Sequence, residues 1–382
     1  MRNTLVAAAA ALVAALSLAA TTARAAQHML VGIYDDGQTL YNGAAAFPAF
    51  QQLHAQIVRV QLLWGGPGGV ALRRPANPGD PSDPAYSWGL YDRAVRRAAE
   101  AGIKLVFSIW GTPRWENGGA GYNVAPRSAV DLQQFAVAAA NRYSGTFEPP
   151  NGQVLPAVRY WLAWNEPNNP VFLKPQFQRV GQTWVYKAAQ DYAKICAAVY
   201  SGVHATMLRD EKVGCGVTSP RGNNAPTSDR PSTSPLAFLR AVKRAGLTRF
   251  DAWAHHPYYG SKVETPTTPP RNTNGGAPTA VTLGNMGALI DELTKLYGSK
   301  RFWITEYGYQ TNPPDEFFGV SWAKQASYLT QAFAIVRKNP RVDMMLWYLL
   351  QDEPALGGWQ SGLQTAAGKR KPAFAAYQSL PR

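Results

Sequence analysis

Cysteine is rare in this chain of 382 residues, because only Cys196 and Cys215 are present. Two cysteines exclude a fold held together by a disulfide framework, and neither has a nearby histidine at the spacing of a zinc site. His255 and His256 are too closely set for such a site, so we expect no bound metal and no cofactor. In an exported protein the two cysteines can pair, and two buried free thiols are an equally open alternative.

Acidic residues are also few, with 24 Asp and Glu against 38 Lys and Arg, which gives a formal net charge of +14. A nucleic-acid-binding protein would need clustered basic residues with stacking aromatics, and here the basic residues are spread along the chain. We therefore expect no nucleic-acid partner. The charge favours an acidic polysaccharide or an anionic envelope as a partner, and solubility alone explains it equally well.

Long apolar runs are missing except at the start of the chain, over residues 5–20. Arg2 supplies a positive beginning, and the Ala-Arg-Ala sequence at 23–25 is typical of a cleavage site. We predict that residues 1–25 are a signal peptide, cut after residue 25 or 26, and that the protein is secreted to the cell envelope or beyond. An uncleaved anchor is disfavoured because the run is short and rich in small residues, so no stable membrane insertion is expected.

Apolar segments and helical segments alternate along the rest of the chain. Such alternation predicts a parallel α/β sheet, and eight units close a (β/α)8 TIM barrel. We predict one catalytic domain over 26–382, with no large accessory domain, and a surface loop over the Pro/Thr/Asn/Gly-rich stretch 259–282. The predicted strands are 30–34, 57–64, 104–110, 160–168, 212–217, 250–256, 302–308 and 342–350, and the predicted helices are 45–55, 87–101, 128–143, 184–200, 234–246, 289–298, 322–338 and 371–377.

Two of these strands end in a glutamate. Glu166 follows an apolar, aromatic segment in Trp164-Asn165-Glu166-Pro167, and Glu306 closes a second one in Thr305-Glu306-Tyr307-Gly308. A lone glutamate at a strand end is more often a polar cap, but two at the same rim of a barrel have the arrangement that cleavage of a glycosidic bond requires. One carboxyl must protonate the leaving oxygen, and the other must attack the anomeric carbon or activate water.

The two motifs together resemble the acid/base and nucleophile signatures of retaining glycoside hydrolases of clan A, with families 5 and 39 as the nearest resemblance. The likeness covers nearly the whole mature chain, although the detailed match is confined to strand ends. It implies that Glu166 is the general acid/base and Glu306 the nucleophile, with the carboxylates about 5 Å apart. Burial and the second carboxylate should raise the pKa of Glu166. The partner would be a carbohydrate, and we expect a monomer.

The resemblance also assigns polar residues around the two carboxylates. Arg59 matches the family's arginine on the second strand, where a buried arginine is costly unless it is paired, and Glu306 is the expected partner. His256 and Tyr258 match the family's His-any-Tyr pair, and their spacing of two places both on one face of a strand. The resemblance implies that Tyr258 donates to Glu306 and that His256 binds a sugar hydroxyl.

Asn165 resembles the family residue that binds the 2-hydroxyl of the sugar. Strict alternation places Asn165 and Glu166 on opposite faces, so both reach the sugar only if the strand bulges or ends there. Trp347 lies on the eighth strand, where the family has a tryptophan platform beneath the sugar. For Trp64, Trp110 and Trp115, core packing and sugar contact remain equally open, and Trp110 is retained as a substrate-binding candidate. Core packing is expected for Trp161, Trp253 and Trp303, and a structural role for His255.

Two other functions fit the same residues. A non-catalytic barrel would keep the cleft and bind carbohydrate without turnover, although the presence of both carboxylates disfavours it. A transglycosylase would share each catalytic residue and differ only in admitting a sugar acceptor in place of water. The sequence leaves open which polysaccharide is cleaved and whether cleavage is internal or terminal, because the loops at the rim of a barrel determine both.

Overall fold

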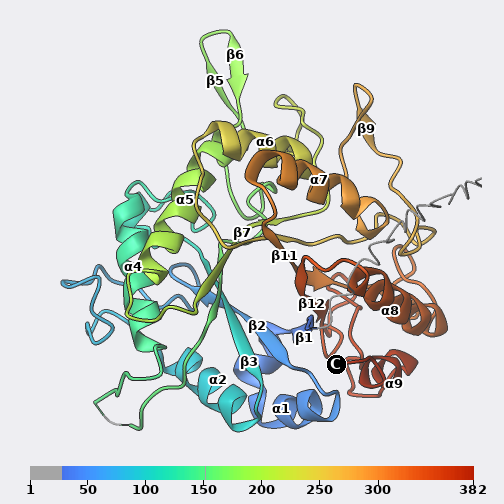
Figure 1. Ribbon diagram of the computed structural model, residues 1–382, viewed down its shortest axis with the longest axis horizontal. Coiled ribbons are helices and arrows are strands. Elements are labelled where there is room, and N and C mark those ends of the chain that lie inside the picture. Colours follow the sequence, from blue (N-terminus) through green and yellow to red (C-terminus); the bar gives the residue numbers. More distant parts are fainter. Residues whose placement is uncertain (1–27, 151) are drawn as a thin grey trace, which may run out of the picture.

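The computed structural model describes residues 28–150 and 152–382. Eight parallel strands close into a barrel in the order β1-β12-β11-β8-β7-β4-β3-β2 (Figure 1). The predicted (β/α)8 barrel is therefore confirmed. The barrel strands are β1 (Leu30–Tyr34), β2 (Ile57–Leu63), β3 (Lys104–Trp110), β4 (Tyr160–Ala163), β7 (Lys212–Thr218), β8 (Ala252–His255), β11 (Arg301–Tyr307) and β12 (Val342–Tyr348).

Helices surround the barrel, and each predicted helix is present (Figure 1). Three of them begin at a serine whose side chain accepts a backbone N–H of the first turn, which satisfies a donor that has no partner within the helix. These serines are Ser128, Ser234 and Ser321. The main helices are α1 (Gly43–Gln52), α2 (Gly89–Glu100), α4 (Ala129–Arg142), α5 (Lys187–Val203), α6 (Pro235–Arg244), α7 (Met286–Tyr297), α8 (Trp322–Arg337) and α9 (Pro372–Gln378), with short turns at η1 (Gly37–Tyr41), α3 (Arg114–Asn117) and η2 (Leu283–Asn285).

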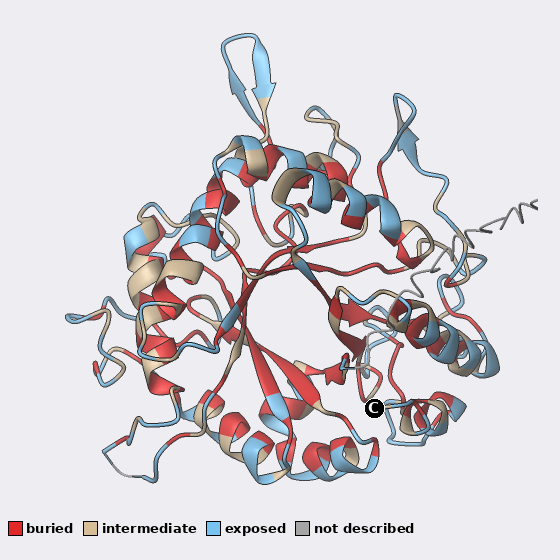
Figure 2. Ribbon diagram, in the orientation of Figure 1, coloured by how far each residue is buried: buried red, intermediate tan, exposed pale blue. Residues whose placement is uncertain are grey.

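The strands are buried on both faces, while the helices expose their outer sides (Figure 2). One apolar cluster fills the inside of the barrel, and a larger one lies between the strands and the helices. Side chains alternate between the two clusters along each strand. On β12, Met344 and Leu346 belong to the inner cluster, whereas Met345 and Trp347 belong to the outer one. This alternation decides which strand residues can reach the cleft.

Cys196 and Cys215 form a disulfide between α5 and β7, which resolves the alternative that the sequence leaves open. Both cysteines are fully buried. The bond closes a loop with a sequence separation of 19 residues. In the chain-entropy account, a loop of this size contributes about 3 kcal/mol by restricting the unfolded chain. The disulfide therefore fastens a peripheral helix to the strand that follows it.

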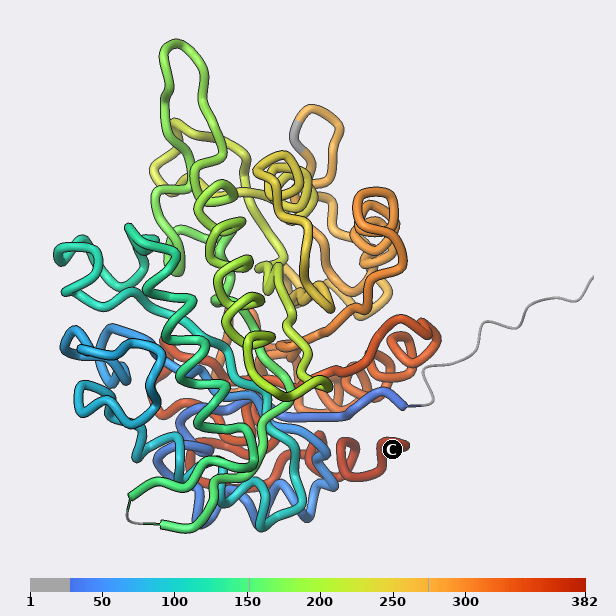
Figure 3. The backbone as a smooth tube through the Cα atoms, turned by 60° about the vertical axis from the view of Figure 1, so that its left-hand side comes forward, coloured from blue at the N-terminus to red at the C-terminus, as the bar shows by residue number. Residues whose placement is uncertain are grey.

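Two short ribbons extend from the loops of the barrel. The hairpin of β5 (Gln178–Val180) and β6 (Thr183–Val185) projects beyond the ring of helices (Figures 1 and 3), and the helix predicted from residue 184 begins three residues later because 183–185 pair as a strand. The predicted surface loop 259–282 carries a second ribbon, β9 (Thr273–Asn274) with β10 (Ala277–Pro278).

No helix in the ranges 28–150 and 152–382 has the length and apolarity needed to cross a membrane. The predicted signal peptide, residues 1–25, lies outside the described residues.

Candidate active site

The two glutamates lie at the carboxyl ends of their strands, at the same rim of the barrel. Strand β4 ends at Ala163, so the alternation of a strand no longer applies to Asn165 and Glu166. Trp164 and Glu166 have φ angles of 71° and 36°, in the left-handed region that bulky residues rarely adopt. This turn brings Asn165 and Glu166 to the cleft together, and Glu306 lines the same cleft from β11. The sequence predicted that Asn165 and Glu166 can both reach the sugar only if the strand bulges or ends there, and β4 does end before them.

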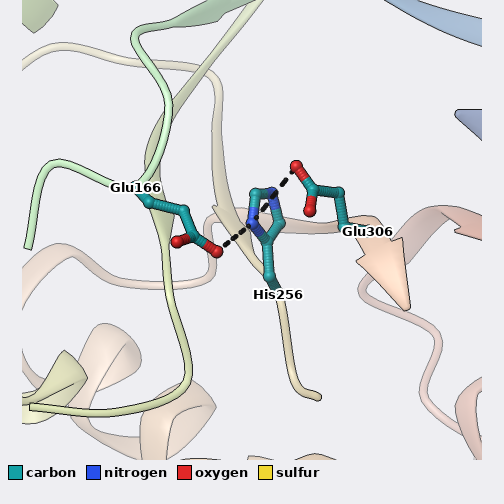
Figure 4. Close-up of side chains that lie close together, drawn as sticks. All are labelled: Glu166, His256 and Glu306. Carbon is teal, nitrogen blue, oxygen red and sulfur yellow. Dashed lines mark hydrogen bonds and ion pairs between the residues drawn. The ribbon is translucent and has the colours of Figure 1, made fainter. Parts of the chain in front are cut away.

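The imidazole of His256 lies between the two carboxylates (Figure 4). Its Nδ1 is 3.0 Å from Glu166 Oε1 and 3.5 Å from Glu306 Oε1. One oxygen of each carboxylate and a ring nitrogen all lie within 4.8 Å of one another. Carboxyl groups about 5 Å apart are typical of retaining glycosidases, whereas inverting enzymes need about 6.5–9.5 Å to admit a water. The close approach of one oxygen from each carboxylate therefore favours direct attack on the sugar.

Arg59 joins Glu306 and Asn165 from beneath the cleft. Its Nη1 donates to Glu306 Oε1 at 2.6 Å, and its Nη2 donates to Asn165 Oδ1 at 2.6 Å and to Ser108 Oγ at 3.2 Å. Burial alone would lower the pKa of Arg59, but Glu306 and other acidic groups nearby raise it above the ordinary value, so the guanidinium stays charged. Arg59 thus has the partner expected from the sequence, Glu306. It is fully buried, so it holds the other residues in place and has no surface for contact with a substrate.

His256 is a neutral, buried ring, because burial lowers its pKa to about 3. Its Nε2 lies 3.2 Å from Arg59 Nη1, and a guanidinium has only donors. Nε2 must therefore accept, which assigns the ring proton to Nδ1, where it donates to Glu166 Oε1 at 3.0 Å. The predicted contact of His256 with a sugar hydroxyl is not available, because the ring has no exposed surface and both nitrogens face protein groups.

Burial raises the pKa of the Glu166 carboxyl from 4.5 to about 7. Asn169, which donates to Glu166 Oε2 at 3.0 Å, opposes this rise, as do the charges of Arg59 and Arg230. Desolvation therefore causes the rise in the pKa of Glu166, and the contribution expected from the second carboxylate, Glu306, is not found. A carboxyl in this state can hold a proton near neutral pH and release it during a reaction.

Tyr258 supplies the second donor to Glu306, from its hydroxyl to Oε2 at 3.0 Å. Burial holds the pKa of Tyr258 well above its usual range, so the hydroxyl keeps its proton and remains a donor. Glu306 therefore accepts from Arg59 through one oxygen and from Tyr258 through the other. The donation from Tyr258 to Glu306 is the contact that the resemblance implied, and Tyr258 also lines the cleft.

Glu166, His256 and Glu306 are also close enough to share a metal ion. Two features of the donor set disfavour a cation. Arg59 already brings a positive charge to 2.6 Å from Glu306 Oε1, and the histidine nitrogen that faces both carboxylates carries the ring proton. The group fits two hydrogen-bonded carboxylates better than a metal site.

The cleft above these residues has a volume of about 1330 Å³. It exceeds the range of roughly 300–1,000 Å³ that is typical of small-molecule pockets, so it can hold more than one sugar unit. Its walls combine aromatic rings, amides and three arginines. Besides Asn165, Glu166, Tyr258 and Glu306, the lining includes Tyr34, Gln61, Asn169, Phe172, Arg221, Arg230, Tyr259, Arg271, Phe318, Tyr348 and Trp359.

Two tryptophans assigned to substrate binding lie outside this cleft. Trp347 faces the outer cluster, is fully buried and donates its ring N–H to the backbone oxygen of Ser361. The predicted sugar platform at Trp347 is therefore wrong by one residue, because the next residue, Tyr348, faces inward. Trp110 lies behind the lining residue Phe172, and its ring centroid is 5.6 Å from that of Phe172. It supports the wall and does not form it.

The other aromatic expectations divide in the same way. Trp64 is buried in the outer cluster, and Trp115 is packed against that cluster with its ring N–H bonded to the backbone of Ala71, so core packing holds for both. Trp161, Trp253 and Trp303 are buried as expected. His255 contacts Thr218 Oγ1 and the backbone oxygen of Val281, which agrees with a structural role.

Several cleft residues escaped sequence reasoning. Tyr34 and Tyr348 end β1 and β12, and Gln61 lies two residues beyond Arg59 on the same face of β2. Period-two counting from Arg59 would have found Gln61. Trp359 has no such signal, because it lies in a loop without periodicity.

No family model matches the chain, and no curated protein matches it in sequence. The likeness to solved structures is clear. A family 39 glycoside hydrolase from the gut symbiont Bacteroides cellulosilyticus WH2 superposes with a TM-score of 0.63 at 19% identity, over 94% of this chain and 63% of that one. A glucosidase from Croceicoccus marinus gives a TM-score of 0.62 at 14% identity, over 93% of this chain and 65% of that one.

Structures of fungal β-1,4-galactanases match over 92% of this chain and 99% of theirs, with a TM-score of 0.58 at 14% identity. This chain spans less than two thirds of the first two structures. It therefore has the (β/α)8 fold of these glycoside hydrolases, the fold that the resemblance to clan A implied.

Proposed function

We propose that the protein is a retaining glycoside hydrolase that cleaves O-glycosidic bonds of an oligo- or polysaccharide by double displacement. The observation that carries this proposal is the pair of carboxylates, one oxygen of each lying within 4.8 Å of the other. One carboxyl can hold a proton near neutral pH, while the other accepts hydrogen bonds from two donors. The shared fold with a family 39 glycoside hydrolase, a glucosidase and galactanases supports it.

In the first step, Glu306 attacks the anomeric carbon while Glu166 gives its proton to the leaving oxygen. The glycosidic C–O bond breaks, and a covalent glycosyl-enzyme forms. Loss of the proton leaves a carboxylate on Glu166, and the Nδ1–H of His256, 3.0 Å away, stabilises that charge. In the second step Glu166 takes a proton from water, the water attacks the anomeric carbon, and Glu306 is released.

The supporting residues prepare these groups before substrate arrives. Arg59 and Tyr258 hold one oxygen each of Glu306, which fixes the direction of attack. Arg59 also donates to the side-chain oxygen Oδ1 of Asn165. The side-chain nitrogen Nδ2 of Asn165 is therefore turned away from Arg59 and can donate to the 2-hydroxyl of the sugar. Tyr348 and Trp359 take the role of aromatic platform that the sequence assigned to Trp347.

The test is a panel of aryl glycosides and polysaccharides, with the anomer of the first product determined by NMR. Release with retained configuration supports the proposal, and inverted configuration refutes the double displacement. Binding without release across the panel would favour a non-catalytic carbohydrate-binding barrel. Added sugar acceptors would reveal a transglycosylase through longer products. We also propose secretion after cleavage near residue 25, which sequencing the amino terminus of the exported protein would test.

A further inference from the structure

Three arginines contribute to the cleft: Arg221, Arg230 and Arg271. Among the lining residues that the structure describes, Glu166 and Glu306 are the only carboxylates. Glu166, with its pKa raised to about 7, carries only part of a negative charge near pH 7, and Glu306 is paired with Arg59. The cleft therefore has an excess of positive charge, and low-dielectric walls concentrate such a field on whatever enters.

These arginines come from two loops that are hydrogen-bonded to each other, because Gly222 N–H donates to the backbone oxygen of Thr279 and Thr279 N–H donates to that of Asn272. Arg221 and Arg230 lie in the loop after β7, and Arg271 lies in the loop after β8. The loop after β7 is fastened to the turn that carries Glu166. Asn168 Nδ2 donates to the backbone oxygens of Ser219 and Thr233, and its Oδ1 accepts the backbone N–H of Ser219. The arginine-bearing loop is thus held beside the proton donor.

The nucleophile has neutral aromatic neighbours instead. Tyr258, which donates to Glu306, has its ring centroid 5.2 Å from Trp359 and 6.2 Å from Tyr348. A retaining mechanism places the attacked sugar over the nucleophile and the leaving group on the side of the acid. The aromatic rings therefore face the sugar that is attacked, and the arginine-bearing loop faces the group that departs.

Two of the guanidinium groups are not engaged in a close ion pair among the described residues. Within 28–150 and 152–382, neither Arg230 nor Arg271 forms an ion pair, while Arg221 has Glu264 at 3.7 Å. A guanidinium binds a carboxylate or a sulfate in a bidentate manner, so an unpaired arginine in a binding cleft is suited to an anionic ligand.

We propose that the leaving-group part of the substrate carries an anionic sugar unit, a uronate or a sulfated sugar, that Arg230 and Arg271 bind. This inference rests on the proposed function, because the acid Glu166 defines the leaving-group side. It also gives Arg230 a second effect. The free guanidinium lowers the pKa of Glu166, and an anion bound to Arg230 offsets that effect, so binding of the correct leaving group helps the acid to keep its proton.

The kinetic test compares two aryl glycosides of the same sugar, namely the sugar that Glu306 attacks. The leaving group is 4-hydroxybenzoate in one and its uncharged methyl ester in the other. The measured quantity is the ratio of kcat/KM for the charged to the neutral substrate. We expect Arg230→Gln and Arg271→Gln each to lower this ratio by about tenfold. Intrinsic reactivity cancels, because the same two substrates are compared in each enzyme. Arg244→Gln, an exposed arginine near the end of α6, is the matched control and should keep the wild-type ratio.

A ratio unchanged in both cleft variants would overturn the proposal, whereas absence of turnover with any glycoside would refute the proposed function instead. A binding measurement covers that second case. Isothermal titration calorimetry measures the affinity of the Glu306→Gln variant for hexagalacturonate and for a sulfated carrageenan hexasaccharide. Comparison of the two affinities shows whether the cleft prefers a carboxylate or a sulfate ester. We expect one of them to bind at least about tenfold more tightly than cellohexaose, with the preference lost in the Arg230→Gln background. Equal affinity for the neutral and charged hexasaccharides would overturn the inference independently of catalysis.

Discussion

The protonation of Glu166 sets the upper pH limit of activity if this residue is the acid. Burial raises its pKa from 4.5 to about 7, which corresponds to about 3 kcal/mol in favour of the neutral carboxyl. Above that pKa the protonated fraction falls about tenfold for each pH unit. For a substrate with a poor leaving group, we expect kcat/KM at about pH 9 to be near 1% of its maximum, because departure then depends on the proton.

The assay is the pH profile of kcat/KM with a phenyl and a 2,4-dinitrophenyl glycoside of the same sugar. The dinitrophenyl group departs without protonation, so its alkaline decline should be much weaker. In Glu166→Ala, the phenyl substrate should lose about 10²- to 10⁴-fold, and its remaining rate should no longer fall above pH 7. An equal loss with both leaving groups would indicate a structural role for Glu166.

A second variant tests whether the pKa of Glu166 sets the alkaline decline. Asn169 donates to Glu166 Oε2 at 3.0 Å and thereby stabilises the charged form. Asn169→Ala should move the alkaline decline to higher pH, by about one unit for a hydrogen bond to a charged group. Asn141→Ala, on α4, is the matched control and should leave the profile unchanged. If Asn169→Ala leaves the decline in place and the decline persists in Glu166→Ala, another group controls the profile and our reasoning fails.

The remaining expectations concern Glu306, Arg59 and Glu211. Glu306→Gln should lower kcat by about 10⁴-fold or more with an unchanged circular dichroism spectrum, and near-normal turnover would remove it as nucleophile. Arg59→Lys keeps a charge but cannot join Glu306, Asn165 and Ser108, so we expect at least about a hundredfold loss of kcat/KM; an unaffected rate would show that the bridge is unnecessary. Burial raises the pKa of Glu211 to about 7, so the folded protein should lose up to about 3 kcal/mol of stability as pH rises from about 4.5 to 7. Glu211→Gln should remove most of that pH dependence in thermal unfolding curves, and identical curves would contradict the assignment.

The barrel and its two glutamates were accessible from the sequence because both rest on strong local signals. Apolar strands and amphipathic helices have different periods, and eight repeats of the pair leave few alternative topologies. Glu166 and Glu306 each follow an apolar strand, so the geometry of a barrel brings them to one rim without further assumptions.

The errors have two physical origins. A tryptophan and a tyrosine are adjacent on β12, and only the register of the closed barrel decides that Tyr348 faces the cleft and Trp347 the helices. The resemblance assigned His256 to a sugar hydroxyl, but the structure uses its ring N–H to hold Glu166. Arg59, by contrast, binds Glu306 as expected, and its burial keeps it from the substrate. The sequence identifies polar groups at a strand end. Which of these groups face the substrate and which lie buried beneath them depends on side chains from several strands.

The buried link between Cys196 and Cys215 has a practical consequence for production of the protein. Neither sulfur has solvent contact once the barrel has closed, so small thiol reagents cannot reach the bond without local opening. A batch folded in a reducing cytosol would carry two thiols that later exposure to air oxidises poorly. Material for the kinetic comparisons should therefore come from an oxidising compartment, and mass spectrometry of the intact chain would show a difference of about two hydrogens between the two preparations.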